Sequence, residues 1–520
     1  MKAQCINLSP NCWLSCEDIA AIALGCVRVE FGDYAYSAML RSQQVLERSI
    51  ECGEPVYGVT TGFGALVQYA VQKHEMYTQG CGLVAHLSAG YGDNIEAAVV
   101  RAAMAARLRT FALGMSGVRR EVVQFYVELL ERNIIAAVPS VGSLGASGDL
   151  IPLAHIARVM IGEGEVLSES GTQPAREVLQ KYGISPCVLT SRDALALVNG
   201  TSFSTAYLAL AVVRCASLLY VAEELSAWIL ALLRCRKHSL HPRLHTAKGH
   251  RGQQDSALNM LGILVSYSNG SHALESPQEM WRHAVEHLPA SEDRPLQEVY
   301  SLRCVPQILG AARDVLYETK RVCEQELNGA DDNPLVCSDT GDILHGGNFM
   351  TQHIGFAADN LNSAITQVAN LAERQIEVLI QPAINGGVPL LLSPTPGKCS
   401  GMAGVQLTAT AVLAEMRAHR QQYASSSLPT NAGNQDIVPL GFQAARECYH
   451  QTERLAAILA CVGMCAAQYA ALVESKFPVP TWLQDFQPLS TDRPLRKEIA
   501  GYAHALLQAS EHSIRQQYVS

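Results

Sequence analysis

The chain has 520 residues, of which 48% are hydrophobic, 17% charged and 6% aromatic. So little charge on so apolar a chain excludes disorder as its main state and favours long packed helices and subunit interfaces. The 39 basic and 48 acidic residues leave a formal net charge of −9, and no long basic run interrupts the sequence, so we expect no binding to nucleic acid.

Sixteen cysteines are scattered along the chain, and none belongs to a Cys-x-x-Cys pair. We interpret them as reduced thiols of a cytoplasmic protein and expect no metal site. The N-terminus lacks the basic region and apolar core of a signal peptide. Two apolar stretches, 208–233 and 455–473, are interpreted as buried helices of a bundle rather than as membrane spans.

Helical patterns follow one another along most of the chain. After a mixed region at 1–55, the elements expected in the first part are a glycine-rich stretch at 58–64, helices at 97–113, 121–130 and 150–161, and a peripheral excursion at 163–190. Long helices are then predicted at 192–198, 204–236, 302–327, 349–380, 403–421 and 438–474, with polar loops at 237–256, 288–300, 328–348, 381–401 and 424–437. The predicted fold is mainly α: a long central helical bundle at 201–520, with a smaller N-terminal part at 1–200 that carries the glycine-rich loops.

A loop of small residues contains the run Gly142-Ser143-Leu144-Gly145-Ala146-Ser147-Gly148-Asp149. It is not a phosphate-binding Walker loop, because no Lys follows the glycines. It is not the nucleophile elbow of a hydrolase either, because Gly148 follows Ser147 directly. On spacing alone, a plain flexible turn is the simplest interpretation.

Ala146, Ser147 and Gly148 can also react with one another. The unhindered nitrogen of Gly148 can bend back onto the carbonyl carbon of Ala146, since only small residues let the backbone curl so tightly. Cyclisation with loss of water, followed by dehydration of the Ser147 side chain, gives a methylidene-imidazolone ring. This ring, a 5-imidazolinone link from Ala146 to Gly148 with a 2,3-didehydroalanine at Ser147, is an electrophile built from the chain itself.

The sequence resembles the aromatic amino acid ammonia-lyases, the family of histidine, phenylalanine and tyrosine ammonia-lyases and the related aminomutases. The likeness covers roughly residues 55–441 and includes the prosthetic-group signature Gly145-Ala146-Ser147-Gly148-Asp149-Leu150. Further motifs in the family's order are Tyr57-Gly58-Val59-Thr60-Thr61-Gly62-Phe63-Gly64, Leu197-Val198-Asn199-Gly200-Thr201-Ser202, Tyr300-Ser301-Leu302-Arg303, Asp332-Asn333-Pro334, His345-Gly346-Gly347-Asn348-Phe349 and Asn434-Gln435-Asp436. The resemblance implies a histidase-like helical fold and elimination of ammonia by the self-formed ring, without an external cofactor or a metal.

The resemblance also assigns roles to single residues. Loss of the unactivated β-proton needs a base, which is Tyr57 by resemblance; because the ordinary pKa of tyrosine is about 10, the site must favour its anion with positive charge or hydrogen-bond donors. Arg303 is the clamp for the substrate carboxylate, since its planar fork binds two oxygens. Asn199 and Asn333 orient that carboxylate and the prosthetic carbonyl. The other positions implied at the substrate are Tyr300, counted with the catalytic residues, and Gly64, Leu87, Phe349, Asn431 and Gln435.

The pair His86-Leu87 carries the expected substrate preference. In the family this pair is His-Leu in tyrosine lyases, Phe-Leu in phenylalanine lyases and Ser-His in histidine lyases. A phenol oxygen buried without a partner costs about 1–3 kcal/mol, and a buried imidazole at His86 would satisfy it and disfavour phenylalanine. Asp436 stands where histidine lyases carry Glu, and Asn431 stands where plant phenylalanine lyases carry a carboxylate. The expected reaction therefore converts L-tyrosine to trans-4-hydroxycinnamate (p-coumarate).

Alternatives to this reading stay open. A tyrosine 2,3-aminomutase resembles the chain closely, although such enzymes often carry Glu at the position of Ala65, and a lyase that prefers phenylalanine or histidine is a further alternative. Outside these activities, Ser147 could serve a serine amidase, or the chain could be an inactive helical scaffold. Either would lack the mass deficit of two waters. The resemblance also implies a homotetramer with shared active sites, so that Tyr57, Arg303 and Gln435 need not come from one chain.

Overall fold

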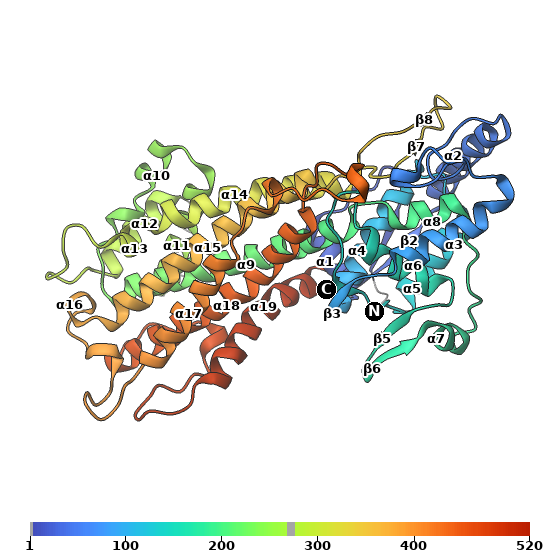
Figure 1. Ribbon diagram of the computed structural model, residues 1–520. Coiled ribbons are helices and arrows are strands. Elements are labelled where there is room, and N and C mark those ends of the chain that lie inside the picture. The colour runs from blue at the N-terminus through green and yellow to red at the C-terminus, as the bar shows by residue number, and fades with distance from the viewer. Residues whose placement is uncertain (1–3, 268–275, 520) are drawn as a thin grey trace.

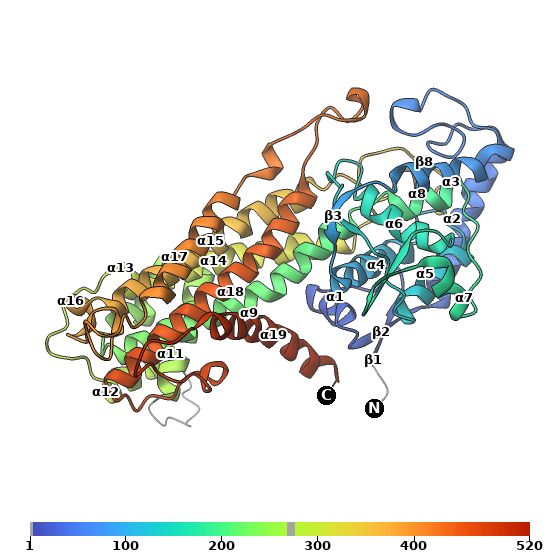
Figure 2. The same cartoon turned by 60° about the horizontal axis from the view of Figure 1, so that its bottom comes forward.

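The computed structural model describes residues 4–267 and 276–519. A compact N-terminal part lies at one end of a long helical bundle, and the described chain starts and ends near the junction of the two (Figures 1 and 2). Strands are confined to four two-stranded sheets in these described ranges. The prediction of a mainly α fold is confirmed.

The N-terminal part packs short helices beside small sheets. Strands β1 (Gln4–Leu8) and β2 (Val27–Phe31) pair in parallel, and α1 (Cys16–Ala23) connects them. The antiparallel pairs are β3 (Tyr91–Asn94) with β4 (Pro139–Val141) and β5 (Glu165–Ser168) with β6 (Gly171–Pro174). The other helices are α2 (Asp33–Glu51), α3 (Met76–Leu87), α4 (Ala97–Ala112), α5 (Arg120–Glu131), α6 (Leu150–Met160), α7 (Ala175–Lys181) and α8 (Ser191–Val198).

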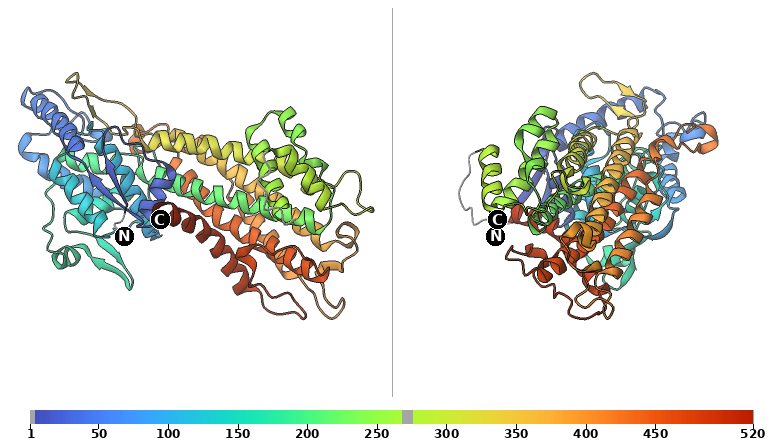
Figure 3. Two further views of the ribbon diagram at one scale, coloured as in Figure 1. Left: turned by 180° about the vertical axis from the view of Figure 1, so that it is seen from behind. Right: turned by 90° about the vertical axis from the view of Figure 1, so that its left-hand side faces the viewer.

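Four long helices form the centre of the bundle: α9 (Ser202–Leu232), α14 (Val305–Leu327), α15 (Gln352–Ile380) and α18 (Gly441–Leu472). Further helices pack along them, namely α11 (Arg251–Ser266), α17 (Ala403–His419) and α19 (Arg496–Val519) (Figure 3). The distal end carries α10 (Pro242–Lys248), α12 (Pro277–His287), α13 (Tyr300–Arg303) and α16 (Pro382–Asn385). A hairpin of β7 (Leu335–Val336) and β8 (Ile343–Leu344) returns the chain to the N-terminal part.

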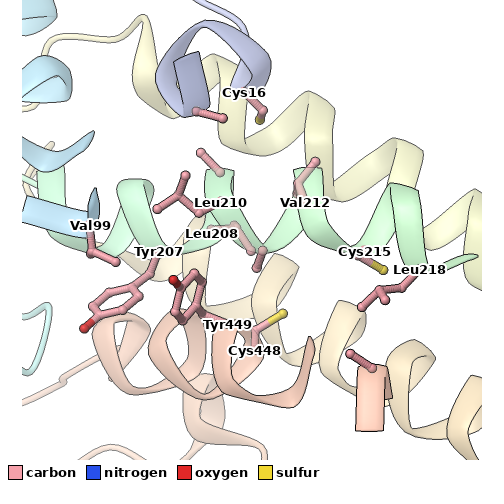
Figure 4. Close-up of a cluster of buried hydrophobic side chains, with 14 of the residues drawn as sticks. Cys16, Val99, Tyr207, Leu208, Leu210, Val212, Cys215, Leu218, Cys448 and Tyr449 are labelled. Atoms are coloured by element: carbon pink, nitrogen blue, oxygen red, sulfur yellow. The ribbon is translucent and has the colours of Figure 1, made fainter. Parts of the chain in front are cut away.

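The two most apolar stretches are the helical segments 191–232 and 441–472, which are long and apolar enough to cross a membrane. Burial accounts for this composition, because 67% and 83% of their most apolar windows are buried inside the protein. In Figure 4, side chains of α9 pack against neighbouring helices, and Tyr207 meets Tyr449 with ring centroids 5.5 Å apart. This arrangement agrees with the interpretation of both stretches as helices of the bundle core.

Several helices were not predicted, because their buried faces are weakly apolar or because a polar loop was expected in their place. In α3 only Gly80, Leu83 and Val84 are buried, so its apolar stripe is short. The predicted loop 237–256 is wrong over α10 and the start of α11. Pro242 begins α10 in its first turn, and the left-handed Gly249 ends it.

The predicted division at residue 200 falls in the turn between α8 and α9. A single cluster of buried apolar residues runs from the N-terminal part into the bundle. The two parts therefore share a core, and the division into an N-terminal part and a bundle stays a prediction.

Candidate active site

A pocket of about 710 Å³ lies where loops of the N-terminal part meet the loops that follow α14 and α17. It brings together most of the predicted site residues, namely Tyr57, Gly64, His86, Leu87, Ala146, Ser147, Asn333, Phe349, Asn431 and Gln435. These residues come from six separate stretches of the chain. Asn199 lies against Ser147 and completes this group.

The small-residue loop folds back on itself at the edge of this pocket. Ala146 and Gly148 pair in an isolated bridge, and Gly145 and Gly148 both have left-handed backbone angles, with φ of +67° and +68°. A Cβ at Gly148 would overlap the backbone of Gly200, and one at Gly145 would overlap the Thr351 side chain. The turn therefore requires glycine at both positions, and it holds residues 146–148 in a tight curl.

Asn199 anchors the side of this loop that faces away from solvent. The first turn of α8 is capped by a hydrogen bond from the Thr190 N–H to the Asp193 carboxylate, and Asn199 directly follows this helix. Its Nδ2 donates to the carbonyl oxygen of Ser147 at 2.9 Å and to the Ser147 Oγ at 3.0 Å. Its Oδ1 accepts from the Asn333 N–H at 3.1 Å. Because every polar atom of this buried amide is engaged, its orientation is fixed.

Asp149 is fully buried directly after the loop. Its carboxylate accepts hydrogen bonds from the Ser143 Oγ and from both the N–H and Oγ of Ser204. Burial nevertheless raises the pKa of Asp149 to about 6, because taking a carboxylate out of water disfavours its charged form. This carboxyl ties the prosthetic loop to the start of α9.

Tyr57 is held at both its backbone and its side chain. Its N–H donates to the His345 Nε2 at 3.1 Å, and its Oη accepts from the backbone N–H of Gly64 at 2.9 Å. The Gly64 N–H therefore fixes the position of the Tyr57 phenol oxygen in the pocket. Gly64 has φ +53°, and a Cβ there would overlap the Asn431 side chain, so only glycine brings this N–H so close.

His86 lies in the last turn of α3, and its Nδ1 is 3.0 Å from the carbonyl oxygen of Gly82. A carbonyl oxygen can only accept, so Nδ1 carries the hydrogen and the Nε2 of the neutral ring is an acceptor. The expectation of a buried imidazole is wrong for the isolated chain, in which His86 is exposed. It lines an open pocket whose other walls are the loops described above.

The pocket has further lining residues that the motifs did not single out. Thr430 donates through its Oγ1 to the Gln435 Oε1 at 2.6 Å, which fixes the Gln435 amide. The apolar walls come from Phe63, Leu66, Val67, Leu83, Leu150, Leu195, Met350 and Ile437. Phe63 and Leu150 belong to the motifs at 57–64 and 145–150. Leu195 and Ile437 lie in segments whose only sequence signal is an apolar residue.

Tyr300 and Arg303 do not reach this pocket in the described chain. They lie on α13, and Figure 1 places α13 at the opposite end of the molecule from α3 and α8. The Arg303 Nε donates to the backbone oxygen of Glu298 at 2.8 Å, and its guanidinium lies 4.7 Å from the centre of the Tyr300 ring. Tyr300 is 69% exposed, so its ring faces solvent in the single chain.

Residues 14–484 match the family model described as aromatic amino acid lyase. The chain belongs to the aromatic amino acid lyase family. The tyrosine ammonia-lyases of Cereibacter sphaeroides and Cupriavidus metallidurans are each 38% identical to it, over 94% and 96% of this chain and 95% of each relative. Among solved structures, a tyrosine aminomutase from Streptomyces globisporus superposes with a TM-score of 0.89 at 33% identity, covering 99% of both chains.

Membership of the aromatic amino acid lyase family confirms the resemblance inferred from the motifs. The chain is accordingly a carbon–nitrogen lyase of the ammonia-lyase type. Within the described residues, no group of three or more His, Cys, Asp or Glu side chains is arranged to hold a metal ion.

Proposed function

We propose that this lyase acts on L-tyrosine, removing ammonia without oxidation to give trans-4-hydroxycinnamate. The observation that carries the proposal is the pocket in which Tyr57, His86 and Ser147 lie together. The two relatives that are 38% identical and named tyrosine ammonia-lyase support the same substrate.

The prosthetic group is proposed at Ala146, Ser147 and Gly148. The nitrogen of Gly148 would bond to the carbonyl carbon of Ala146, whose oxygen leaves as water with the amide hydrogens of Ser147 and Gly148. The Ser147 hydroxyl and Cα hydrogen would leave as a second water. The residues fit this reaction, because the turn curls Ala146 against Gly148 and because Asn199 donates to the Ser147 carbonyl. The finished ring supplies an electrophilic carbon that makes the substrate amine a better leaving group.

Tyr57 would take the β-proton of the substrate. The Gly64 N–H already donates to its phenol oxygen, so the charge that a phenolate carries has a fixed donor before substrate binds. The hydrogen bond from the Tyr57 N–H to His345 holds the base in the pocket. General base catalysis by a positioned side chain contributes about 10²–10⁴-fold to a rate, which is the contribution expected of Tyr57.

His86 would recognise the phenol of the substrate. Its Nε2 is an acceptor because Nδ1 is bonded to the Gly82 carbonyl oxygen, and a tyrosine O–H is a donor. Phenylalanine would leave that nitrogen without a partner once the pocket is closed to water. Leu87 and the apolar walls would hold the ring itself.

The carboxylate clamp is proposed to come from another subunit. Arg303 and the exposed Tyr300 lie on α13, away from the pocket of their own chain, and among the described residues no Lys or Arg lines that pocket. In a cytoplasmic homotetramer, α13 of one subunit would deliver both side chains to the site of a neighbour. Asn333, Phe349, Asn431 and Gln435 would then line the substrate from the other side.

Mixed tetramers test this sharing. Tyr57→Phe and Arg303→Ala chains are each expected to be inactive alone, and co-refolding them should restore part of the activity, because some sites would receive an intact Tyr57 and an intact Arg303. The matched control mixes Tyr57→Phe with Ser147→Ala, whose defects lie in the same pocket. If mass measurements verify that mixed tetramers form and neither mixture recovers activity, the shared site is contradicted.

A tyrosine 2,3-aminomutase is the second candidate function, favoured by the 0.89 TM-score to a tyrosine aminomutase. The His86-Leu87 pair and Ala65 support the lyase instead. The serine amidase is less well supported, because Ser147 is hydrogen-bonded to the amide of Asn199, which cannot take its proton.

The deciding experiment is a near-ultraviolet assay of purified protein with tyrosine, phenylalanine and histidine in separate cuvettes, together with the mass of the intact chain. The expected result is a 4-hydroxycinnamate band from tyrosine and a mass two waters below the encoded value. β-Tyrosine in place of that band would identify a mutase. No product from any substrate and an intact encoded mass would refute the proposal.

A further inference from the structure

A buried cluster of charges lies behind the prosthetic loop and takes no part in the proposed chemistry. It comprises Arg107 from the middle of α4, Arg192 from α8, and the adjacent pair Asp331 and Asp332. Arg107 has no exposed surface, and its two terminal nitrogens each bind a different aspartate at 2.7 Å. We propose that Arg107 is a positioning residue for ring formation, acting through Asp331 and Asp332. This inference rests on the proposed function, since it assumes that the ring forms.

The first arm runs through Asp331 to Gly148. Asp331 binds Arg107 with Oδ1, and with Oδ2 it accepts from the Thr201 N–H at 2.6 Å and from the Thr201 Oγ1 at 3.1 Å. This fixes Gly200, whose carbonyl accepts from the Asp149 N–H at 2.7 Å. A Cβ at Gly200 would overlap the Arg107 guanidinium, and a Cβ at Gly148 would overlap Gly200. Arg107, Gly200 and Gly148 are thus stacked with no room between them.

The second arm runs through Asp332 to Ser147. Asp332 accepts from Arg107 and, at 3.3 Å, from Arg192, whose Nη1 also donates to the carbonyl oxygen of Asn333. The Asn333 N–H in turn holds the Asn199 side chain, which donates to the Ser147 carbonyl. The Arg107 guanidinium is therefore connected through one arm to Gly148, which supplies the nucleophilic nitrogen, and through the other arm to Ser147, the central residue of the ring.

The composition of the cluster favours a role in positioning the backbone over a role in stabilising the fold. Two arginines and two aspartates balance in charge, yet taking four charges out of water is costly, and packed apolar residues in their place are often as stable or more so. What an apolar cluster could not do is hold two backbone segments by directed hydrogen bonds. A planar guanidinium does this at two points at once, whereas a lysine ammonium is a single point of charge.

Ring formation is sensitive to such positioning because Gly148 must approach the Ala146 carbonyl closely. A displacement of about 1 Å in reacting groups can slow a reaction roughly 100-fold. Arg107→Lys keeps a buried positive charge but cannot bind both aspartates in the same way. The folded variant is therefore expected to form the ring roughly 100-fold more slowly than the unaltered chain.

The test measures the mass of the peptide that contains residues 146–148 in full-length protein, at intervals after purification. Freshly isolated Arg107→Lys protein with native circular dichroism should retain the encoded mass in most chains, while the unaltered protein lacks two waters. The matched control is Arg109→Lys, because Arg109 is also buried on α4 but donates to Asn328 and Pro10 instead. A role in stability alone would lower the melting temperature of both variants and leave the ring fully formed in their folded fractions.

Asp331→Asn is the second variant and keeps the inference testable if Arg107→Lys does not fold. It preserves size and removes the charge that binds Arg107, so unconverted mass is again expected in folded protein. Complete conversion at the unaltered rate in the folded variants would overturn the role of Arg107 and leave the proposed function standing. Encoded mass in the unaltered protein would overturn both.

Discussion

Replacing His86 with phenylalanine tests how the pocket distinguishes tyrosine from phenylalanine. The imidazole is the polar group that α3 presents to the pocket, and its hydrogen bond to Gly82 leaves the Nε2 as an acceptor. His86→Phe removes that acceptor and supplies an apolar ring of similar shape. We expect the ratio of kcat/KM for tyrosine to kcat/KM for phenylalanine to fall.

The size of the change follows from the hydrogen bond that is lost. Leaving a phenol O–H without its partner costs about 1–3 kcal/mol. At about 1.4 kcal/mol per tenfold change, the ratio should fall by roughly 5- to 150-fold. Because His86 is exposed in the isolated chain, a value near the upper end requires that the assembled site excludes water.

The assay follows cinnamate and 4-hydroxycinnamate formation from each substrate over a range of concentrations. His74→Phe is the matched control, since His74 is also exposed, precedes α3 on the same segment and does not line the pocket. Its ratio should equal that of the unaltered protein. An unchanged ratio in His86→Phe, with the two-water deficit intact, would refute the assignment of His86 to the phenol.

Three other substitutions, one of them with a matched control, give distinct expectations. Tyr57→Phe should lower kcat by about 10²–10⁴-fold while leaving the two-water mass deficit complete, and a variant with near-normal kcat would remove Tyr57 as the base. Gly200→Ala should lower the free energy of unfolding in urea by about 3–5 kcal/mol, because the added Cβ displaces Arg107 from its buried ion pairs. Gly501→Ala, on an open face of α19, should instead raise it by up to about 1 kcal/mol, and similar values for the two alanines would contradict the packing described. Burial raises the pKa of Glu326 from 4.5 to about 7, so its protonated form is favoured in the folded state, and the stability this provides is present below pH 4.5 and lost as the pH rises through about 7. Glu326→Gln should therefore remove about 3 kcal/mol of pH dependence from unfolding between pH 4.5 and 8, and parallel stability profiles would contradict the shift.

Short stretches of sequence determined most of the chemistry. Gly145, Gly148 and Gly64 occupy positions where the backbone is left-handed and a side chain would collide with a neighbour, so their identity is dictated by local geometry. The long apolar periodicity predicted the bundle, because a helix buried on every side must be apolar all round. Helices with few buried apolar residues, such as α3, left too faint a pattern to predict.

Only the tertiary structure decided which residues meet. Residues 57, 86, 147, 333 and 435 are distant in sequence, and their common pocket depends on how α3, α6, α8 and the loop after α17 pack. Arg107 and Asp331, the ion pair that fixes Gly200, are 224 residues apart in the sequence. No local sequence pattern predicts this contact. The same holds for the separation of Arg303 from the pocket, because the lengths of α9, α14 and α15 set how far α13 stands from the ring-forming loop. Sequence motifs fix local conformation and reactive groups, whereas long-range contacts arise from the summed packing of whole helices.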